Sequence, residues 1–394
     1  MTKVANNYIL GDVIQMALNF SVWKQPTSIL NWCSVLLGIL LSACTVIQTG
    51  GTQSPPEQVA IDLYYATDRK DEESATTVIK FGNQRGELSF GTCQITINTV
   101  KNRRTALSNN GAWPASEPLI HTWDAKLIRV SLLSFQELSE RMEQHLRNSG
   151  DQSILLYIHG YAKSFEESAE NLARFVYEIN YQGAPLLYSW PSKGSAAGYH
   201  ADTTTLDWSS HHLETVLSKL SQETKFNTIH IVAHSLGNRG MLKALSKVIE
   251  RQRFEQRNWK FGEVILLAPD VDKGLFARDW APGLQHIPSR VTLYLSSEDF
   301  PLKVSKTLNQ YPRLGDGRFG PLVYPGIETI DVSEAITPLR GHSYFRKANA
   351  VLTDLHYLIN QRRGAYERPN LHAEPSPDGY YWLLRSSSRG DNSE

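Results

Sequence analysis

Short apolar runs alternate with longer segments of helical periodicity over most of the chain. Residues 153–158 (SILLYI) form a continuous apolar run, which is typical of a strand buried on both faces of a parallel sheet. Similar runs predict strands at 185–189, 228–233, 263–268, 290–295 and 328–332. Apolar residues at helical spacing predict helices at 135–147, 165–179, 203–220, 236–252 and 344–360. This alternation predicts an α/β fold, with a doubly wound, mostly parallel sheet and helices on both of its faces.

The pattern outside this region is less regular. Runs rich in β-branched and aromatic residues predict earlier strands at 61–66, 93–97 and 126–131. We therefore expect one folded domain over residues 59–362. Residues 363–394 are polar and end in RSSSRGDNSE, which predicts a partly disordered C-terminal tail.

The N-terminal segment has the features of a targeting signal. Residues 29–43 are mostly apolar, but the uninterrupted apolar part is shorter than the roughly 20 residues of a membrane span and fits a secretory leader. The sequence LSAC, which ends at Cys44, resembles the bacterial lipoprotein signal box, in which this cysteine is acylated. We therefore expect a leader at 1–43, a flexible Gly-, Ser- and Pro-rich tether at 44–58, and a lipid anchor on the membrane.

Alternatives remain for this segment. Only Lys3 and Lys24 supply positive charge before the apolar part, so translation starting at Met16 would give a more conventional leader. An uncleaved anchor helix, or a buried helix of the fold, is the other interpretation. Thr45 rather than Asp follows Cys44, which by resemblance to sorted lipoproteins indicates the outer membrane, with the protein in the cell envelope facing the periplasm.

Composition narrows the classes of partner. Lys plus Arg and Asp plus Glu both number 40, so no overall field favours nucleic acid. The three cysteines, Cys33, Cys44 and Cys93, fit no zinc motif and offer no disulfide framework. We expect no metal and no cofactor, and the sequence leaves the oligomeric state open.

Ser235 is the leading candidate for chemistry. The apolar run at 228–233 (TIHIVA) leads into HSLG at 234–237 and then directly into a helix. This strand–turn–helix context displays a serine nucleophile at the top of a hydrolase sheet. The sharp turn requires small residues two positions to either side, where Ala233 and Gly237 stand. The pentapeptide alone occurs by chance, and its position between a buried strand and a helix makes it informative.

A second signal follows the strand at 153–158. His159, Gly160 and Tyr161 occupy the position of the loop that supplies an oxyanion-hole donor. We expect the backbone N–H groups of Tyr161 and Leu236 to be the two donors, since Leu236 begins a helix. Gly160 lets the backbone approach a substrate, and His159 is interpreted as a structural histidine that orients the loop. His234, next to the serine, is a supporting residue.

The acid of a triad is sought after a later strand. The chain order in this type of site is serine, acid, histidine, and the candidates are Asp270, Asp272, Glu298 and Asp299. We favour Asp299, because the strand before it is the commoner location of the acid. Asp270 is the alternative acid. If it is not the acid, we interpret Asp270 as a supporting residue near the pocket.

Three histidines follow Asp299, namely His342, His356 and His372. His356 lies within a predicted helix and His372 in the polar tail. His342 lies between the last strand and the last helix, beside Gly341, where a general base is needed. The predicted triad is therefore Ser235, Asp299 and His342.

An ordered set of motifs resembles a family of bacterial α/β-hydrolases known as domain of unknown function 900, which is grouped with esterase- and lipase-like enzymes. The resemblance covers roughly residues 60–360. The stretches that carry it are YATDR at 65–69, ILLYIHGY at 154–161, LLYSWPS at 186–192, HIVAHSLGNRGM at 230–241, LLAPDVD at 266–272, LYLSSED at 293–299 and GHSYF at 341–345. The resemblance implies the α/β-hydrolase fold and ester-type hydrolysis by the same three residues, but it implies no particular substrate.

These observations predict a serine hydrolase that cleaves a carboxylic ester of a small molecule or lipid through an acyl-enzyme. Two alternatives remain. One is transfer of the acyl group to a lipid or sugar alcohol by the same residues. The other is a membrane-tethered binding protein that keeps the fold without turnover.

Overall fold

The computed structural model describes residues 57–72, 79–99, 125–195, 198–223, 225–255, 260–285, 289–336 and 348–385. They belong to one compact unit, Ser54–Glu394. The predicted leader at 1–43, Cys44 and the tether up to residue 56 lie outside the described residues.

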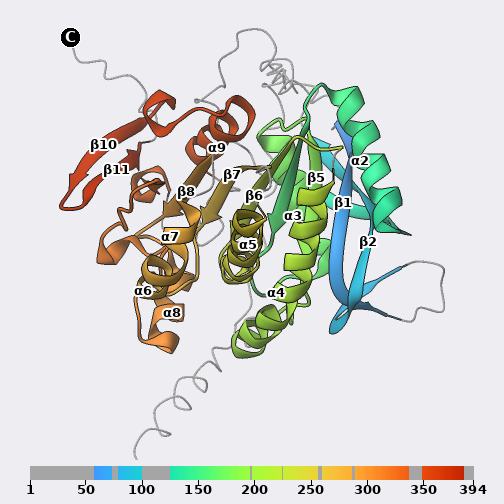
Figure 1. Cartoon of the computed structure of the whole chain (residues 1–394), viewed down its shortest axis with the longest axis horizontal. Helices are drawn as coiled ribbons and strands as arrows, with labels where there is room; N and C mark the ends of the chain where they lie inside the picture. The colour runs from blue at the N-terminus through green and yellow to red at the C-terminus, as the bar shows by residue number, and fades with distance from the viewer. Residues whose placement is uncertain are drawn as a thin grey trace, which may run out of the picture. The chain divides into compact units, whose positions relative to one another are not determined.

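The described unit is built on one sheet. Its strands are β1 (Glu57–Asp71), β2 (Phe81–Thr99), β3 (Ala125–Leu133), β4 (Ser153–Ile158), β5 (Ala184–Ser189), β6 (Thr228–His234), β7 (Phe261–Leu267), β8 (Arg290–Leu295), β9 (Ile327–Asp331), β10 (Leu371–Ser376) and β11 (Gly379–Leu384). They form an 11-stranded sheet in the order β10-β11-β9-β8-β7-β6-β4-β5-β1-β2-β3 (Figure 1). In this spatial order, every neighbouring pair from β11 to β1 is parallel. The pairs β1-β2, β2-β3 and β10-β11 are antiparallel.

Helices cover both faces of this sheet. The long ones are α2 (Phe135–Ser149), α3 (Phe165–Glu178), α4 (Tyr199–Gln222), α5 (Gly237–Phe254), α8 (Phe300–Asn309) and α9 (Asn349–Gln361). Short turns of helix are α6 (Lys273–Leu275), η2 (Phe276–Trp280), α7 (Ala281–Leu284), η3 (Gly317–Phe319), η4 (Ser333–Ala335) and η6 (Ala365–Glu367). None of the helices in the described ranges is both long and apolar enough to cross a membrane.

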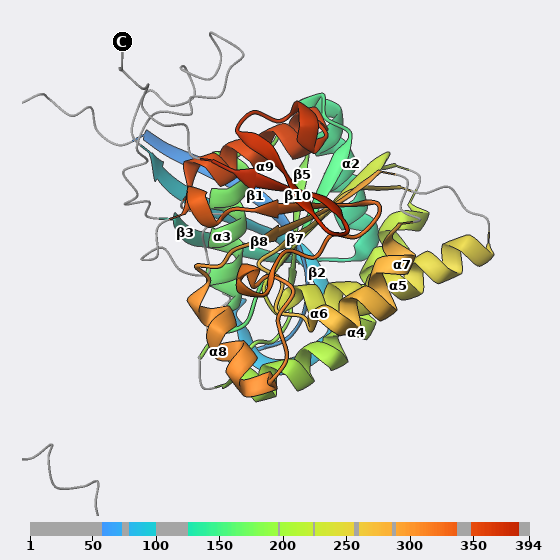
Figure 2. The same ribbon diagram turned by 90° about the vertical axis from the view of Figure 1, so that its left-hand side faces the viewer.

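Two hydrophobic cores lie on the two faces. One contains apolar side chains of α2, α4 and α5, and the other contains those of α3 and α9. Figure 2 shows α4 and α5 on one side of the strands and α3 on the other. The prediction of an α/β fold with a doubly wound, mostly parallel sheet is therefore confirmed.

Local sequence signals set the start of two helices, α2 and α3. Ser134 caps α2 and Ser164 caps α3, and in each case a glutamate three residues later bonds back to the cap, at Glu137 and Glu167. Such reciprocal caps satisfy amide donors that a helix leaves unpaired at its start. The predicted starts of both helices agree with the structure for this reason.

The parallel strands also match the predicted ranges within two residues, and β4 and β8 match fully. The helix predicted at 203–220 differs at its start, because α4 begins at Tyr199. Its first turn contains Asp202, a fully buried aspartate that bonds to neighbouring loops. A buried polar turn of this kind lacks the apolar spacing by which a helix is recognised.

The prediction for the C-terminal tail is wrong up to residue 385. Strands β10 and β11 form an antiparallel hairpin, and β11 pairs in parallel with β9 through Trp382 and Leu383. The folded domain therefore extends beyond 362. Strand β10 (LHAEPS) contains Pro375 and polar residues, so its sequence does not predict a strand, although β11 (GYYWLL) is largely aromatic and apolar.

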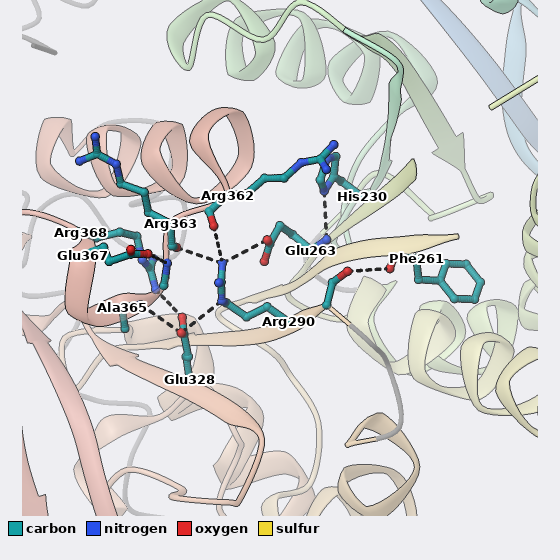
Figure 3. Close-up of polar contacts among 12 residues, drawn as sticks. His230, Phe261, Glu263, Arg290, Glu328, Arg362, Arg363, Ala365, Glu367 and Arg368 are labelled. Carbon is teal, nitrogen blue, oxygen red and sulfur yellow. Dashed lines mark hydrogen bonds and ion pairs between the residues drawn. The ribbon is translucent and has the colours of Figure 1, made fainter. Parts of the chain in front are cut away.

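A cluster of charged residues joins this C-terminal segment to the amino ends of the parallel strands (Figure 3). Arg290 at the start of β8 contacts Glu263 at 3.1 Å and Glu328 at 3.2 Å. Arg368, after η6, contacts Glu328 and Asp354, each at 2.7 Å. The cluster lies at the edge of the sheet opposite to the loop after β6, where Ser235 lies.

Candidate active site

Ser235 lies on a strained turn between β6 and α5. Its φ is 54°, in the left-handed region that residues other than glycine rarely adopt. The turn is held by the Ser235 N–H, which donates to the Leu267 carbonyl at 2.9 Å, and by the Ser235 carbonyl, which accepts from the Asn238 side chain at 3.0 Å. This is the strand–turn–helix geometry that the sequence predicts around Ser235.

The Ser235 hydroxyl is buried, and its Oγ has no hydrogen-bond partner among the described residues. An unbonded buried hydroxyl is unfavourable by about 1–3 kcal/mol and calls for an explanation. A role of this hydroxyl as a nucleophile, which bonds to its substrate during a reaction, is one such explanation.

The loop after β4 passes directly beside this turn. Ile158 of β4 pairs in parallel with Ala233 of β6, so the two loops leave the sheet side by side. A Cβ atom added at Gly160 would lie 3.0 Å from the Ser235 Cβ, and one added at Gly237 would lie 2.4 Å from the His159 carbonyl oxygen. Gly237 therefore requires the absence of a side chain, and Gly160 leaves room for a Cβ only if the serine turn shifts slightly.

The two predicted oxyanion donors belong to these two loops. Leu236 has helical φ and ψ of −60° and −28° and is the residue before the first turn of α5. Neither its N–H nor that of Tyr161 donates a hydrogen bond to any part of the chain that the structure describes. Within the described ranges, both amides therefore lack an acceptor, which an oxyanion-hole donor must also lack before a ligand binds.

His159 is a buried structural histidine, as the sequence interpretation has it. Its ring stacks on Trp190 at a centroid distance of 5.1 Å, and its Nδ1 lies 2.7 Å from the Gly160 carbonyl oxygen. Burial, and then the nearby charge of Arg69, lower the pKa of His159 well below its usual range, so the ring is neutral.

Asp202 at the start of α4 ties the same loop to its surroundings. Its carboxylate accepts hydrogen bonds from the Ala162 N–H at 3.3 Å, the Ser192 hydroxyl at 2.6 Å and the Lys193 N–H at 2.7 Å. Ala162 has a φ of 55° and so needs such support. The loop after β4 is thus fixed on the side that faces α4.

Asp299 is fully buried and begins α8, where its Oδ1 accepts from the Leu302 N–H at 3.1 Å. It follows β8 on the same edge of the sheet as Ser235. The Tyr161 hydroxyl lies within electrostatic range of Asp299, and burial, followed by the charges of Asp270, Asp202 and Asp299, raises the Tyr161 pKa. Asp299 and the loop after β4 thus lie at the same edge of the sheet, after the carboxyl ends of parallel strands.

Asp270 has a different environment. Its Oδ1 accepts from Arg313 Nε at 2.7 Å and from the Ser305 hydroxyl at 2.6 Å, and its Oδ2 accepts from the Tyr199 hydroxyl at 2.9 Å. Arg313 is itself buried and its Nη2 also donates to the Asp270 backbone carbonyl at 3.3 Å, so this is an internal ion pair supported by further hydrogen bonds. The Asp270 N–H donates to the Ser235 carbonyl at 3.1 Å, which ties the network to the serine turn.

The predicted base, His342, lies outside the described residues, as does Gly341. Of the other histidines considered, His356 lies in α9 with its Nδ1 2.8 Å from the Ile179 carbonyl oxygen, and His372 lies in β10. His234, beside the serine, is buried, with its Nδ1 3.0 Å from the position that a Cβ on Gly160 would take. Within the described ranges, no three His, Cys, Asp or Glu side chains gather so as to hold a metal ion.

Several residues around the site were not singled out from the sequence. They are Arg69, Asp202, Tyr199, Ser305 and Arg313. Their contacts reach far along the chain, since Arg69 meets His159 across 90 residues, Tyr199 meets Asp270 across 71 and Arg313 meets Asp270 across 43. No local spacing reveals such pairs. One signal does exist for Arg69, because a charged pair that ends an apolar strand, as in YYATDR, requires buried partners.

Comparison with known proteins agrees with this architecture. Residues 134–362, more than half of the chain, match the family model described as "Alpha/beta hydrolase of unknown function (DUF900)". A search of curated proteins found no match.

Two solved structures are among those similar to this chain. One is the carboxylesterase CesB of Bacillus subtilis, with 12% sequence identity, a TM-score of 0.29, and coverage of 54% of this chain and 82% of CesB. The other is esterase B from Lactobacillus rhamnosis, solved with a C4-C4 SN3 tributyrin phosphonate, with 12% identity, a TM-score of 0.28, and coverage of 50% and 69%. The family match spans α2 to α9 and includes both loops at Ser235. The chain belongs to the family of alpha/beta hydrolases of unknown function that this match defines.

Proposed function

We propose that this protein is a serine hydrolase that cleaves carboxylic esters, with Ser235 as its nucleophile. The observation that carries the proposal is the serine turn, where Ser235 has a φ of 54° and an Oγ with no hydrogen-bond partner among the described residues. The Tyr161 and Leu236 N–H groups belong to this turn and to the neighbouring loop, and they too have no acceptor within the described ranges. Nucleophile and paired oxyanion donors in one place are what acyl transfer requires.

In the proposed reaction, Ser235 Oγ attacks the ester carbonyl carbon and His342 takes the hydroxyl proton. The carbonyl oxygen becomes an oxyanion that accepts hydrogen bonds from the Tyr161 and Leu236 N–H groups. Collapse breaks the bond to the alcohol, which leaves with the proton from His342. Water then attacks the acyl-enzyme, His342 again serves as base, and the carboxylic acid is released.

We assign the acid of the triad to Asp299. Asp270 already bonds to Arg313, Ser305 and Tyr199, so turning it toward a histidine would break an internal ion pair. Asp299 caps a helix through Oδ1 and so has a fixed carboxylate orientation. The role of His342 rests on its position in the chain after the acid, together with the family resemblance.

The test is labelling of the protein with a fluorophosphonate probe and assay with p-nitrophenyl esters of graded acyl length. Ser235→Ala should abolish labelling and lower turnover by about 10⁴ to 10⁶. Ser209→Ala is a matched control, because Ser209 is also a buried serine whose Oγ lacks a partner among the described residues. A folded wild-type protein that neither labels nor hydrolyses any ester would make it a non-catalytic binding protein.

The same assay separates hydrolysis from transfer. Adding glycerol or a long-chain alcohol to the ester should leave the yield of free acid unchanged if water is the acceptor. A new ester formed at the expense of the acid would identify the protein as an acyltransferase that uses the same intermediate.

We further propose that the domain is tethered to a membrane by acylation of Cys44. The support is the LSAC sequence after a short apolar segment. Radioactive palmitate should label the wild type and a Cys93→Ser control, but not a Cys44→Ser variant. Labelling that survives Cys44→Ser contradicts the tether.

A further inference from the structure

Arg69 of β1 is a buried arginine whose five N–H groups are all used. Its Nε donates to the Ser189 hydroxyl at 2.8 Å. Its Nη1 donates to the Gly82 carbonyl at 3.1 Å and to the Asn83 side chain at 3.3 Å. Its Nη2 donates to the Lys163 carbonyl at 2.7 Å and lies 3.5 Å from His159 Nε2. Arg69 thus joins β1, β2 and β5 to the loop after β4.

Each of these acceptors is neutral, which is unusual for a buried guanidinium. The carboxylates that act on Arg69, led by Asp68 and Glu166, do so only through longer-range electrostatics. Burial lowers the Arg69 pKa to about 10, so the group is charged at neutral pH. Burying a charge without a bonded counter-ion is unfavourable, and such arrangements concentrate where function requires them.

His159 connects this charge to the candidate oxyanion loop. Because the Gly160 carbonyl can only accept, the hydrogen on the His159 ring must be on Nδ1, which lies 2.7 Å from it. The Nε2 lone pair is then left to face Arg69 Nη2 and the Ser189 hydroxyl, each at 3.5 Å, and that hydroxyl itself accepts from Arg69 Nε. Stacking on Trp190, whose Nε1 donates to the His159 carbonyl at 2.9 Å, fixes the plane of the ring.

The orientation of the Tyr161 amide follows from this chain of contacts. A trans peptide directs its C=O and its N–H to opposite sides. Since the Gly160 oxygen is held toward the His159 ring, the Tyr161 N–H of the same peptide is directed away from it. Arg69 also holds the Lys163 carbonyl at the far end of the loop, so the loop is fixed on both sides of Tyr161.

We propose that Arg69 is a positioning residue that acts through His159 to aim the Tyr161 N–H at the oxyanion. The inference rests on the proposed function, since it presupposes a reaction at Ser235. Arg69 touches no substrate in this scheme. Its contribution is to the charge that develops during the reaction and not to binding of the ester itself.

Two single variants and their combination test the inference with p-nitrophenyl acetate and a fluorophosphonate. Arg69→Lys keeps the charge but cannot make the same set of five bonds. His159→Asn keeps a donor near the Gly160 carbonyl but removes the Nε2 acceptor. We expect each variant to lower kcat and the rate of phosphonylation by about 10- to 100-fold, while KM changes by less than about threefold. The kcat of the double variant should be little lower than that of either single variant, because both substitutions break the same chain of contacts from Arg69 through His159 to the Gly160 carbonyl.

Arg368→Lys is the matched control. Arg368 is also a buried arginine, but it bonds to Asp354 and Glu328 at the opposite edge of the sheet. This variant should lower the melting temperature and leave kcat near the wild-type value.

The outcomes separate the two proposals. If Arg69→Lys and His159→Asn lower kcat no more than Arg368→Lys, or raise KM alone, Arg69 is a structural residue only and the inference is wrong. The same holds if the two losses multiply in the double variant. If the wild type is inert toward both reagents, the proposed function fails and the inference fails with it. Should Arg69→Lys not fold, His159→Asn still decides through its kcat.

Discussion

The two buried aspartates near Ser235 should respond in opposite ways to the same substitution by asparagine. Asp299→Asn leaves the cap of α8 in place, because asparagine caps a helix as well as aspartate does. Asp270→Asn instead leaves Arg313, which is 5% exposed, without a carboxylate. One change therefore removes a charge from the proposed triad, and the other removes it from an internal ion pair.

The magnitudes follow from these environments. Breaking a buried ion pair by neutralising one partner destabilises a protein by about 3–5 kcal/mol. For a domain of this size, that corresponds to a fall of roughly 6–10 °C in the melting temperature. For Asp299→Asn we expect less than about 1 kcal/mol of destabilisation, but a loss of about 10⁴ in kcat, since the histidine would lose the group that fixes its tautomer. For Asp270→Asn, we expect the kcat of the folded protein to fall less than about tenfold, because Asp270 acts on Ser235 only through its backbone N–H.

The assay is kcat for p-nitrophenyl acetate, measured well below the lower melting temperature and compared with a calorimetric or dichroism melt. Asp272→Asn is the control, since Asp272 caps α6 through the Leu275 N–H in the same segment as Asp270. Equal or greater loss of kcat in Asp270→Asn than in Asp299→Asn would refute the assignment of the acid. A stable Asp270→Asn protein would refute the argument about Arg313.

Three further predictions concern other parts of the molecule. Gly160→Ala should lower kcat by at least about tenfold with little effect on the fold, because the added methyl would lie 3.0 Å from the Ser235 Cβ; an unchanged kcat would contradict the close packing of the two loops. Glu263→Gln should remove a pH dependence of stability: burial raises the Glu263 pKa from 4.5 to about 7, so its stabilising contribution is full at low pH and is lost as the pH rises through about 7. The wild type should therefore lose up to about 3 kcal/mol relative to the variant between roughly pH 4.5 and pH 8, measured by urea unfolding, and parallel profiles would exclude the shift. Truncation after Asn370 should leave β9 without its outer neighbour and give a protein that aggregates at concentrations where the full chain stays monodisperse in light scattering.

The central sheet could be predicted from sequence because its strands are buried on both faces. The burial of every residue of β4 is what makes SILLYI a continuous apolar run. Strand β1, which spans 15 residues, was predicted only at 61–66, because its ends pair with β2 on the open side of the sheet and carry polar residues. The C-terminal hairpin was missed because its place in the sheet depends on the pairing of Trp382 in β11 with Ile330 in β9, far earlier in the chain.

The candidate site divides in the same way. Ser235, Gly160 and Gly237 belong to turns whose geometry depends on residues next to them in the chain. The sequence alone therefore predicts these turns. The supporting contacts could not be predicted. Arg69 meets His159 across 90 residues, and Arg313 meets Asp270 across 43, so these pairs exist only once the sheet has formed.

The position of β11 has a consequence for the order in which the chain can fold. This strand lies between β9 and β10 but is the last strand of the described chain to be synthesised. Until residue 368 and β11 have been synthesised, β9 has no outer neighbour and Asp354 has no Arg368 to contact. Completion of this side of the sheet is therefore a late step in the synthesis of the domain. A nascent chain in that interval presents an open strand edge, which is prone to pair with other chains.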